Sequence, residues 1–371
     1  MKFFLLPNKI FVLIVCITFF LQGFAQLRIT EVGAAYNLED ALKNPTEIRK
    51  VHIENTSLKT LPEDFGKLVN LEELSLEGNL LTTLPKSFVK LKSLRTLVLI
   101  NNNFKEFPKA LKKLDSLSVV RLDNNQLESL PEWIDEMKGL HTLVVTNNNI
   151  AKLPDAIGNL KNLEWFHAEN NKLEHLPASF GNLNNLKRLN LNANFLSDVP
   201  DNFSNLENLT HLNIDSNKLT DISKIIVCKS LYIVHLSFNA IKEVPESFTN
   251  LQNLAGIYLN NNLLTELPEQ IGKLNSLQYF VINSNKLERL PTSIGNLKNL
   301  KWLYANDNKL ISVPNEIGKL HNLEVLTLSL NNIKQLPLTF FTNLKALKQV
   351  YLDADTEAFI PDTLKNKVIR R

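Results

Sequence analysis

The chain has 371 residues, of which 44% are hydrophobic, with 41 basic and 38 acidic side chains. Lys2 and Lys9 lie in an N-terminal segment that we expect to be removed, which lowers the formal net charge from +3 to +1. This balance excludes the basic stripe that nucleic-acid binding requires. The apolar content is ample for a large core, and this length is typical of two domains unless the chain is a repeat array.

Residues 1–25, MKFFLLPNKIFVLIVCITFFLQGFA, are typical of a secretory signal peptide. The apolar run Ile10–Leu21 follows the early lysines, and Gly23 and Ala25 provide the small residues for cleavage before Gln26. A retained membrane anchor would need about 20 apolar residues, more than this run contains. A lipoprotein signal at Cys16 would need a small residue where a valine stands. We therefore predict an exported protein, periplasmic, cell-surface or secreted, with no membrane span in the mature chain.

Residues 26–47 are predicted to form an N-terminal helical cap. The stretch Tyr36–Lys43 has helical spacing, and Asn37 suits the N-cap position because its side chain accepts a hydrogen bond from a free backbone N–H. Glu39 and Asp40 suit the positive end of the helix dipole. We expect this helix to cover the first repeat, whose corner residue is Thr56 instead of asparagine.

An internal repeat extends over residues 48–352. Its frame is L-x-x-L-x-L-x-x-N-x-L-x-x-L-P-x-x-[IF]-x-x-L, with a period of 23 residues and one step of 22. Such self-similarity is typical of repeat architectures, and this range holds about 13–14 units. The asparagine of the frame stands in phase at Asn79, Asn102, Asn125, Asn148, Asn171, Asn194, Asn217, Asn239, Asn262, Asn285, Asn308 and Asn331.

Local chemistry explains the frame. The alternation in Leu74-Ser75-Leu76 predicts a short strand with both leucines inward, and one strand per repeat forms a parallel sheet. The asparagine follows the strand, where its amide bonds to turn backbone that lacks other partners. The proline, such as Pro85, holds an extended bend on the outer side. Each repeat buries its apolar face only against its neighbours.

This frame resembles the leucine-rich repeat family, in particular its 23-residue LPxxIGxL class, as in the Ras-group repeat proteins and many bacterial homologues. The resemblance implies an α/β solenoid: a horseshoe with a concave parallel β-sheet and an irregular or 3-10 convex side. Secreted animal and plant members usually carry cysteine-stapled caps. Cys228 is the single cysteine of the mature chain, so an internal disulfide is impossible, and the resemblance implies a bacterial protein.

The array departs from its period in two repeats and at its C-terminal end. The repeat Leu209–Leu231 is one residue short and has Ser223 in place of proline, which indicates either a hinge or partner contact or a tolerated convex-side deletion. The repeat that begins at Leu323 is one residue longer than the 23-residue period. Residues 353–371 are predicted to form a C-terminal cap and basic tail, with Asp355 at the asparagine position. The residues expected to cover the last layer are Phe359, Ile360 and Leu364.

The strand positions that face the concave side are the candidate binding residues. Three such positions in each of fourteen repeats are about 11% of the chain, yet they hold 10 of its 16 Trp, Tyr and His residues. Strand propensity accounts for part of the aromatic excess but not for the histidines. Aromatic residues and arginine dominate binding hot spots. The candidates are Trp165, His167, Glu169, Arg188, His211, Asp215, His235, Tyr258, Tyr279, Trp302 and Tyr304.

The sequence favours a non-enzymatic binding module that recognises a protein or peptide on this face. A carbohydrate ligand that stacks on the tryptophans and tyrosines, and an architectural scaffold of the envelope, are the alternatives. We find no nucleophile beside a base and no glycine-rich phosphate loop, and we expect no cofactor and no metal. The ligand's identity and the oligomeric state are not determined by the sequence.

Overall fold

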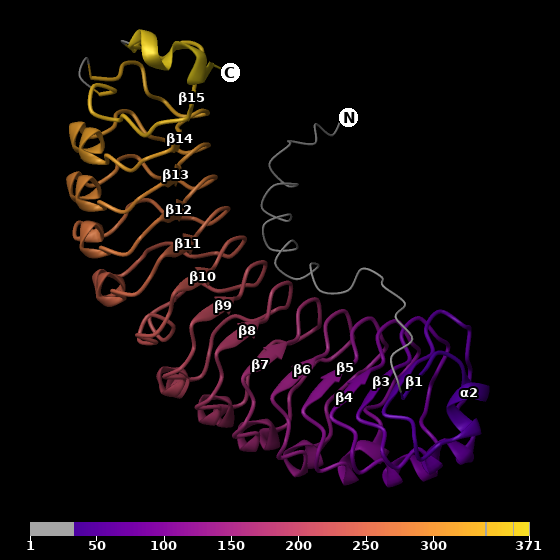
Figure 1. The fold of residues 1–371 in the computed structure, drawn as a ribbon. Coiled ribbons are helices and arrows are strands. Elements are labelled where there is room, and N and C mark those ends of the chain that lie inside the picture. The colour runs from indigo at the N-terminus through magenta and orange to yellow at the C-terminus, as the bar shows by residue number, and fades with distance from the viewer. Residues whose placement is uncertain (1–32, 338–339, 359, 371) are drawn as a thin grey trace, which may run out of the picture.

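The computed structural model describes residues 33–337, 340–358 and 360–370. Within them the chain forms an open arc, with one parallel sheet on its inner side and short helices on its outer side (Figure 1). The sheet has sixteen strands, each paired in parallel with the next one in the chain. No helix among these residues is long and apolar enough to cross a membrane. The predicted signal peptide lies outside the described residues.

The strands recur once per repeat and are mostly three residues long. Their order in the sheet is their order in the chain, so every repeat packs between its two sequence neighbours, as in a solenoid. The strands are Ala34–Ala35 (β1), Lys50–His52 (β2), Glu73–Ser75 (β3), Thr96–Val98 (β4), Val119–Arg121 (β5), Thr142–Val144 (β6), Trp165–His167 (β7), Arg188–Asn190 (β8), His211–Asn213 (β9), Ile233–His235 (β10), Gly256–Tyr258 (β11), Tyr279–Val281 (β12), Trp302–Tyr304 (β13), Val325–Thr327 (β14), Gln349–Leu352 (β15) and Val368–Arg370 (β16).

The outer side of the arc consists of single 3-10 turns that follow the prolines. Pro154, with φ −71° and ψ 153°, is extended and leads directly into one of them. Gly158 in that turn is required by close packing, because a Cβ there would lie 2.1 Å from the Ser179 carbonyl oxygen. The 3-10 helices are Glu63–Lys67, Lys86–Lys90, Lys109–Lys113, Glu132–Glu136, Asp155–Asn159, Ala178–Asn182, Asp201–Asn205, Glu246–Asn250, Ile271–Lys273, Thr292–Asn296, Asn315–Lys319 and Asp362–Lys367.

The predicted asparagine ladder connects neighbouring repeats. Asn171 donates to the carbonyls of Val145, Ala168 and Glu169 at 2.9, 3.1 and 3.2 Å, and its Oδ1 accepts the Ile150 N–H at 2.9 Å. The residue before each of the twelve ladder asparagines has a positive φ of 51–68°. Nine ladder asparagines are buried. The half-buried ones are Asn217 and Asn239, which are separated by the single 22-residue step, and Asn331 at the C-terminal end of the ladder.

The N-terminal cap agrees with the prediction and adds a strand to it. Helix α2, Leu38–Lys43, begins after Asn37, whose side chain accepts the Asp40 N–H at 2.8 Å. Ahead of the helix, β1 pairs with β2 and extends the sheet, which the sequence analysis did not anticipate. Thr56 replaces the corner asparagine and donates its hydroxyl to Asn79 Oδ1 at 2.8 Å.

Two features of the C-terminal cap go beyond what the sequence indicated. Asp355 does not continue the ladder: its carboxylate is exposed and bonds Lys334 at 2.6 Å, because a carboxylate cannot donate to turn carbonyls as an amide does. Part of the basic tail, Val368–Arg370, forms strand β16, which pairs with β15. Leu364 is buried and Ile360 packs on the core as predicted, whereas Phe359 lies outside the described residues.

The 22-residue repeat has a turn on its outer side where most repeats have a 3-10 helix. Lys224 there forms ion pairs with Asp198 and Asp201 of the preceding repeat. Cys228 is buried, and its thiol donates to the Phe203 carbonyl at 3.3 Å. Burial raises the pKa of Cys228 to about 12. This cysteine is therefore a small apolar residue of the core.

Candidate functional site

The strands that carry the candidate residues, or lead into them, lie along the inner side of the arc (Figure 1). In β7, Phe166 is fully buried, while Trp165 and His167 on either side of it are half-buried. The parallel register aligns equivalent positions, so that Trp165 pairs with Arg188. We name three columns after the repeat positions they contain: the first column (as Trp165), the middle column (as His167) and the last column (as Glu169). All eleven candidates belong to these columns.

Cross-strand contacts hold the side chains of β7 and β8. The Arg188 guanidinium lies 4.9 Å from the centre of the Trp165 ring, within the range of a cation–π contact. Glu169 accepts hydrogen bonds from Asn190 and from Thr146, both at 2.6 Å, and one of its oxygens lies 3.3 Å from His167 Nδ1. The carboxylate thus connects three repeats, and these side chains are preorganised.

A half-buried carboxyl group and two half-buried imidazoles lie near the centre of the face. Asp215 accepts the Ser237 N–H at 2.5 Å, and its other oxygen lies 3.7 Å from His235 Nδ1. Burial raises the pKa of Asp215 to about 7, and burial with the neighbouring His211 lowers the pKa of His235 to about 4. Burial, and the positive charge of Arg188, also lower the pKa of His211.

Aromatic side chains dominate the C-terminal third of the face. The His235 ring stacks on Tyr258 with centres 4.1 Å apart and planes 6° apart. Farther along, Trp302 meets Tyr279 at 4.8 Å and Tyr304 at 6.2 Å, both edge to face. Burial and the nearby Tyr351 raise the pKa of Tyr304. Gly256 leaves room for Tyr258, because a Cβ there would lie 3.3 Å from its ring.

The structure shows no metal-binding geometry in the part of the chain that it describes. There, no group of three or more His, Cys, Asp or Glu side chains could hold an ion. The Asp215 carboxyl lies beside His235, and His167 contacts Glu169, so these imidazoles and carboxyls form separate pairs. The arrangement offers hydrogen bonds, ring contacts and one titratable carboxyl group to a ligand.

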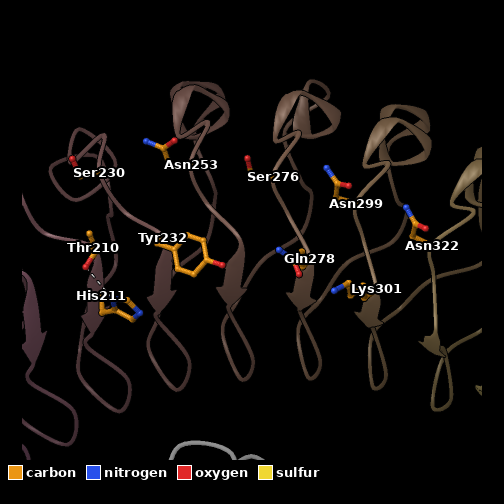
Figure 2. A pocket seen from close by; sticks show the side chains of 10 residues that line it. All are labelled: Thr210, His211, Ser230, Tyr232, Asn253, Ser276, Gln278, Asn299, Lys301 and Asn322. Atoms are coloured by element: carbon orange, nitrogen blue, oxygen red, sulfur yellow. Dashed lines mark hydrogen bonds between the residues drawn. The ribbon is translucent and has the colours of Figure 1, made fainter. Parts of the chain in front are cut away.

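A polar groove of roughly 830 Å³, which was not among the predicted sites, lies at the edge where the strands begin (Figure 2). Some of its asparagines form a second ladder: Asn299 donates to Asn275 O at 2.7 Å, and Asn322 to Lys298 O at 2.8 Å. These asparagines precede a core leucine in phrases such as LKNL, at a regular spacing that the sequence displays. The groove is lined by Thr210, His211, Ser230, Tyr232, Asn253, Ser276, Gln278, Asn299, Lys301 and Asn322.

Comparison with known proteins identifies the family. The chain matches the model of a leucine-rich repeat region over residues 14–145, and that of the leucine-rich repeat over residues 138–196 and 229–287. It is 30% identical to a leucine-rich repeat protein of Leptospira interrogans, covering 91% of this chain and 99% of that one, with a TM-score of 0.82. The chain belongs to the leucine-rich repeat family.

More distant structures share the fold. An internalin of Listeria monocytogenes is 22% identical over 83% of this chain and 88% of its own, with a TM-score of 0.74. The plant peptide hormone receptor RGFR1, solved in complex with RGF2, is 23% identical over 93% of this chain and 68% of its own, with a TM-score of 0.59. No curated protein matches the sequence.

Proposed function

We propose that this protein is an exported, non-enzymatic module that binds an extended polypeptide on the concave face of its sheet. Leucine-rich repeat proteins generally act as protein-interaction modules. The observation that supports the concave face is the gathering of tryptophan, tyrosine, histidine and arginine side chains on it, held by contacts such as Arg188 over Trp165. A preordered face loses little conformational entropy on binding.

A polypeptide suits this face better than a glycan. Sugar rings stack on aromatic faces, but Arg188 already lies over the Trp165 ring and His235 covers one face of Tyr258. Trp302 packs edge to face with its two tyrosine neighbours, and this leaves a relief of ring edges and faces instead of a flat platform. Such a relief is complementary to side chains of varied shape.

The test is a selection of displayed random dodecapeptides on the immobilised protein without residues 1–25, with an oligosaccharide array probed in parallel. We expect peptides to be enriched and to lose affinity at least about tenfold when Trp165, Tyr258 and Trp302 are replaced by alanine, since buried aromatic anchors carry most of the binding energy. Affinities are measured by isothermal titration, after circular dichroism has established folding.

Phe195→Ala with Phe238→Ala is the matched control, because these exposed aromatic residues lie outside the three columns. The control variant should bind the selected peptides as the parent does. Peptides that bind the triple-alanine variant unchanged, or ligands found only on the oligosaccharide array, would contradict the proposal.

Export rests on the N-terminal sequence and has its own test. Mass spectrometry of the protein expressed in a Gram-negative bacterium with its N-terminus intact should find Gln26 as the first residue in the exported fraction. Recovery of a chain that begins at Met1 and stays inside the cell would contradict export.

A further inference from the structure

The middle column alternates large and small side chains from β11 to β15. Tyr258, Val281, Tyr304, Thr327 and Tyr351 occupy successive strands in direct register. The three tyrosines are half-buried, whereas Val281 is 6% exposed and Thr327 2% exposed. Tyrosines therefore stand at every second strand, with a small buried residue between them. We call Tyr258, Tyr304 and Tyr351 the tyrosine row.

The spacing of the tyrosine row discriminates among ligand conformations. Neighbouring strands lie about 4.8 Å apart, so tyrosines two strands apart repeat every ~9.6 Å along the arc. A polyproline II helix has three residues per turn and a rise of about 3.1 Å, a repeat of ~9.3 Å. Side chains on one face of an extended β-strand repeat every ~6.7 Å, and an α-helical turn every ~5.4 Å. Only the polyproline II repeat matches one tyrosine interval.

The columns on either side of the tyrosine row offer aromatic rings and hydrogen-bond donors to a ligand in the polyproline II conformation. Tyr279 and Trp302 form an aromatic border in the first column. In the last column, Asn260 and Asn283 each accept the backbone N–H of the next repeat through Oδ1, at 3.0 and 2.8 Å, and the other end of each amide is a donor. A polyproline II segment has no internal hydrogen bonds, so its carbonyls need such donors.

The absence of charged residues in the three columns from β11 to β14 also discriminates among ligands. From β11 to β14 the residues of the three columns are Gly256, Tyr258, Asn260, Tyr279, Val281, Asn283, Trp302, Tyr304, Asn306, Val325, Thr327 and Ser329, and none carries a charge. The strands β2 to β9, in contrast, present carboxylates, lysine and arginine in the same columns. At the C-terminal end of the row, Asp353 follows Tyr351 in the last column, and its carboxylate accepts the backbone N–H groups of Leu330 and Asn331. Over Tyr258 and Tyr304, charge complementarity favours an uncharged segment, because desolvating an unpaired charge there costs free energy.

We propose that the tyrosine row holds an uncharged, proline-rich polypeptide segment in the polyproline II conformation, running across the strands. Every third residue of the segment lies between successive tyrosines, above Val281 and above Thr327. Aromatic surfaces of this kind exploit the low conformational entropy of a preformed polyproline II helix. This inference deepens the proposed function and rests on it.

The experiment titrates the protein without residues 1–25 with acetylated, amidated decaproline and, separately, with an uncharged Gly-Ser decapeptide. We expect saturable binding of decaproline alone. Tyr304→Ala should weaken it at least about tenfold, as for an interface anchor. Phe195→Ala, which removes an exposed phenylalanine outside the columns, should leave the affinity within about twofold.

A second pair of variants tests the alternation itself. Thr327→Tyr fills the interval between Tyr304 and Tyr351 and should abolish decaproline binding, although it adds an aromatic ring. Val144→Tyr makes a similar change in the middle column of β6, away from the row, and should not affect binding. If Thr327→Tyr fails to fold by circular dichroism, Tyr351→Ala replaces it, with the expected loss again at least about tenfold.

The outcomes separate this inference from the proposed function. Equal decaproline affinity for the parent and Tyr304→Ala overturns the inference. The inference is also overturned if decaproline does not bind while the selected peptides bind through the concave face and lack prolines three residues apart. The proposed function stands in that case. If no peptide binds through this face and only oligosaccharides do, both fail. Enrichment of uncharged peptides with prolines at i and i+3, sensitive to Tyr304→Ala, supports both.

Discussion

The two ends of the concave face differ in the chemistry of their last column. Near the N-terminus this column holds Glu54, Glu77 and Asp123, and burial, together with repulsion from the other two carboxylates, raises the pKa of Glu77. In the repeats of β11, β12 and β13 the same column holds Asn260, Asn283 and Asn306, followed by Ser329 and Asp353. Asn283 Oδ1 accepts the N–H of Asn306, whose own Oδ1 accepts the N–H of Ser329 at 2.9 Å. One end presents charge, and the other relays hydrogen bonds between repeats.

This contrast shows that the scaffold and the face are specified by different residues. The core leucines and the ladder asparagines recur in both halves, whereas the exposed columns vary from repeat to repeat. A repeat can therefore change what it presents without changing how it stacks. Binding specificity then resides in the columns and stability in the frame.

The largest effect is expected from the ladder, equally in both halves. Asn102 makes four hydrogen bonds of 2.9–3.2 Å in the N-terminal half, and Asn285 makes four of 2.9–3.1 Å in the C-terminal half. Replacing either by alanine leaves several buried backbone groups without partners, which should lower the free energy of unfolding by about 3–5 kcal/mol. Urea denaturation followed by circular dichroism measures the loss.

Asn299→Ala is the control for this pair, because that asparagine makes a single exposed hydrogen bond, to Asn275 O. Asn299→Ala should lower the free energy of unfolding by no more than about 1 kcal/mol. A severalfold difference between the two ladder variants would mean that the halves do not share one frame.

Much of the fold was predictable because the period determines it. Spacing alone places every leucine and asparagine of a repeat, so the strands β2–β15 and the ladder follow from the sequence. The edge strands were not predictable in this way. β1 and β16 lie outside the period, and their pairing depends on the free edge of a neighbouring strand. The repeat period places Asp355 at the asparagine position, but position alone does not show that a carboxylate cannot donate the hydrogen bonds of the ladder.

The candidate surface was predictable only as a set of positions. Alternation identifies which residues face the concave side, but side-chain partners depend on rotamers and on register across the short repeat. There the register pairs His235 with Asn213, which brings His235 close to Asp215. The alternation of Tyr258, Val281, Tyr304, Thr327 and Tyr351 is visible in the sequence once the middle column is written out, yet its burial pattern is not.

A smaller, pH-dependent effect distinguishes the centre of the face. Asp215 has a pKa of about 7 in the folded chain against an ordinary value of 3.8, so its contribution to stability is full at acidic pH and is lost as the pH rises through 7. His235, with its pKa lowered to about 4 from 6.5, acts oppositely between pH 4 and 6.5. The two effects oppose each other between pH 4 and 6.5, so only the last part of the Asp215 loss, about 1 kcal/mol, should appear alone, as a fall in stability between pH 6.5 and 8.

Asp215→Asn should remove that fall and stabilise the protein at pH 8–9 by up to about 4 kcal/mol, since each pKa unit corresponds to ~1.4 kcal/mol. Urea denaturation at pH 6, 7, 8 and 9 measures the free energy of unfolding of the parent, of Asp215→Asn and of a second variant from the other half. Asp123→Asn is the comparison from the N-terminal half. Burial raises the pKa of Asp123 as well, but Arg121 stands 3.4 Å away and opposes the rise. Removing this carboxylate deprives the arginine of its partner, so its gain at pH 8–9 should be smaller or absent. Equal responses would show that the arginine contributes nothing, and that burial alone distinguishes these carboxyl groups from exposed ones.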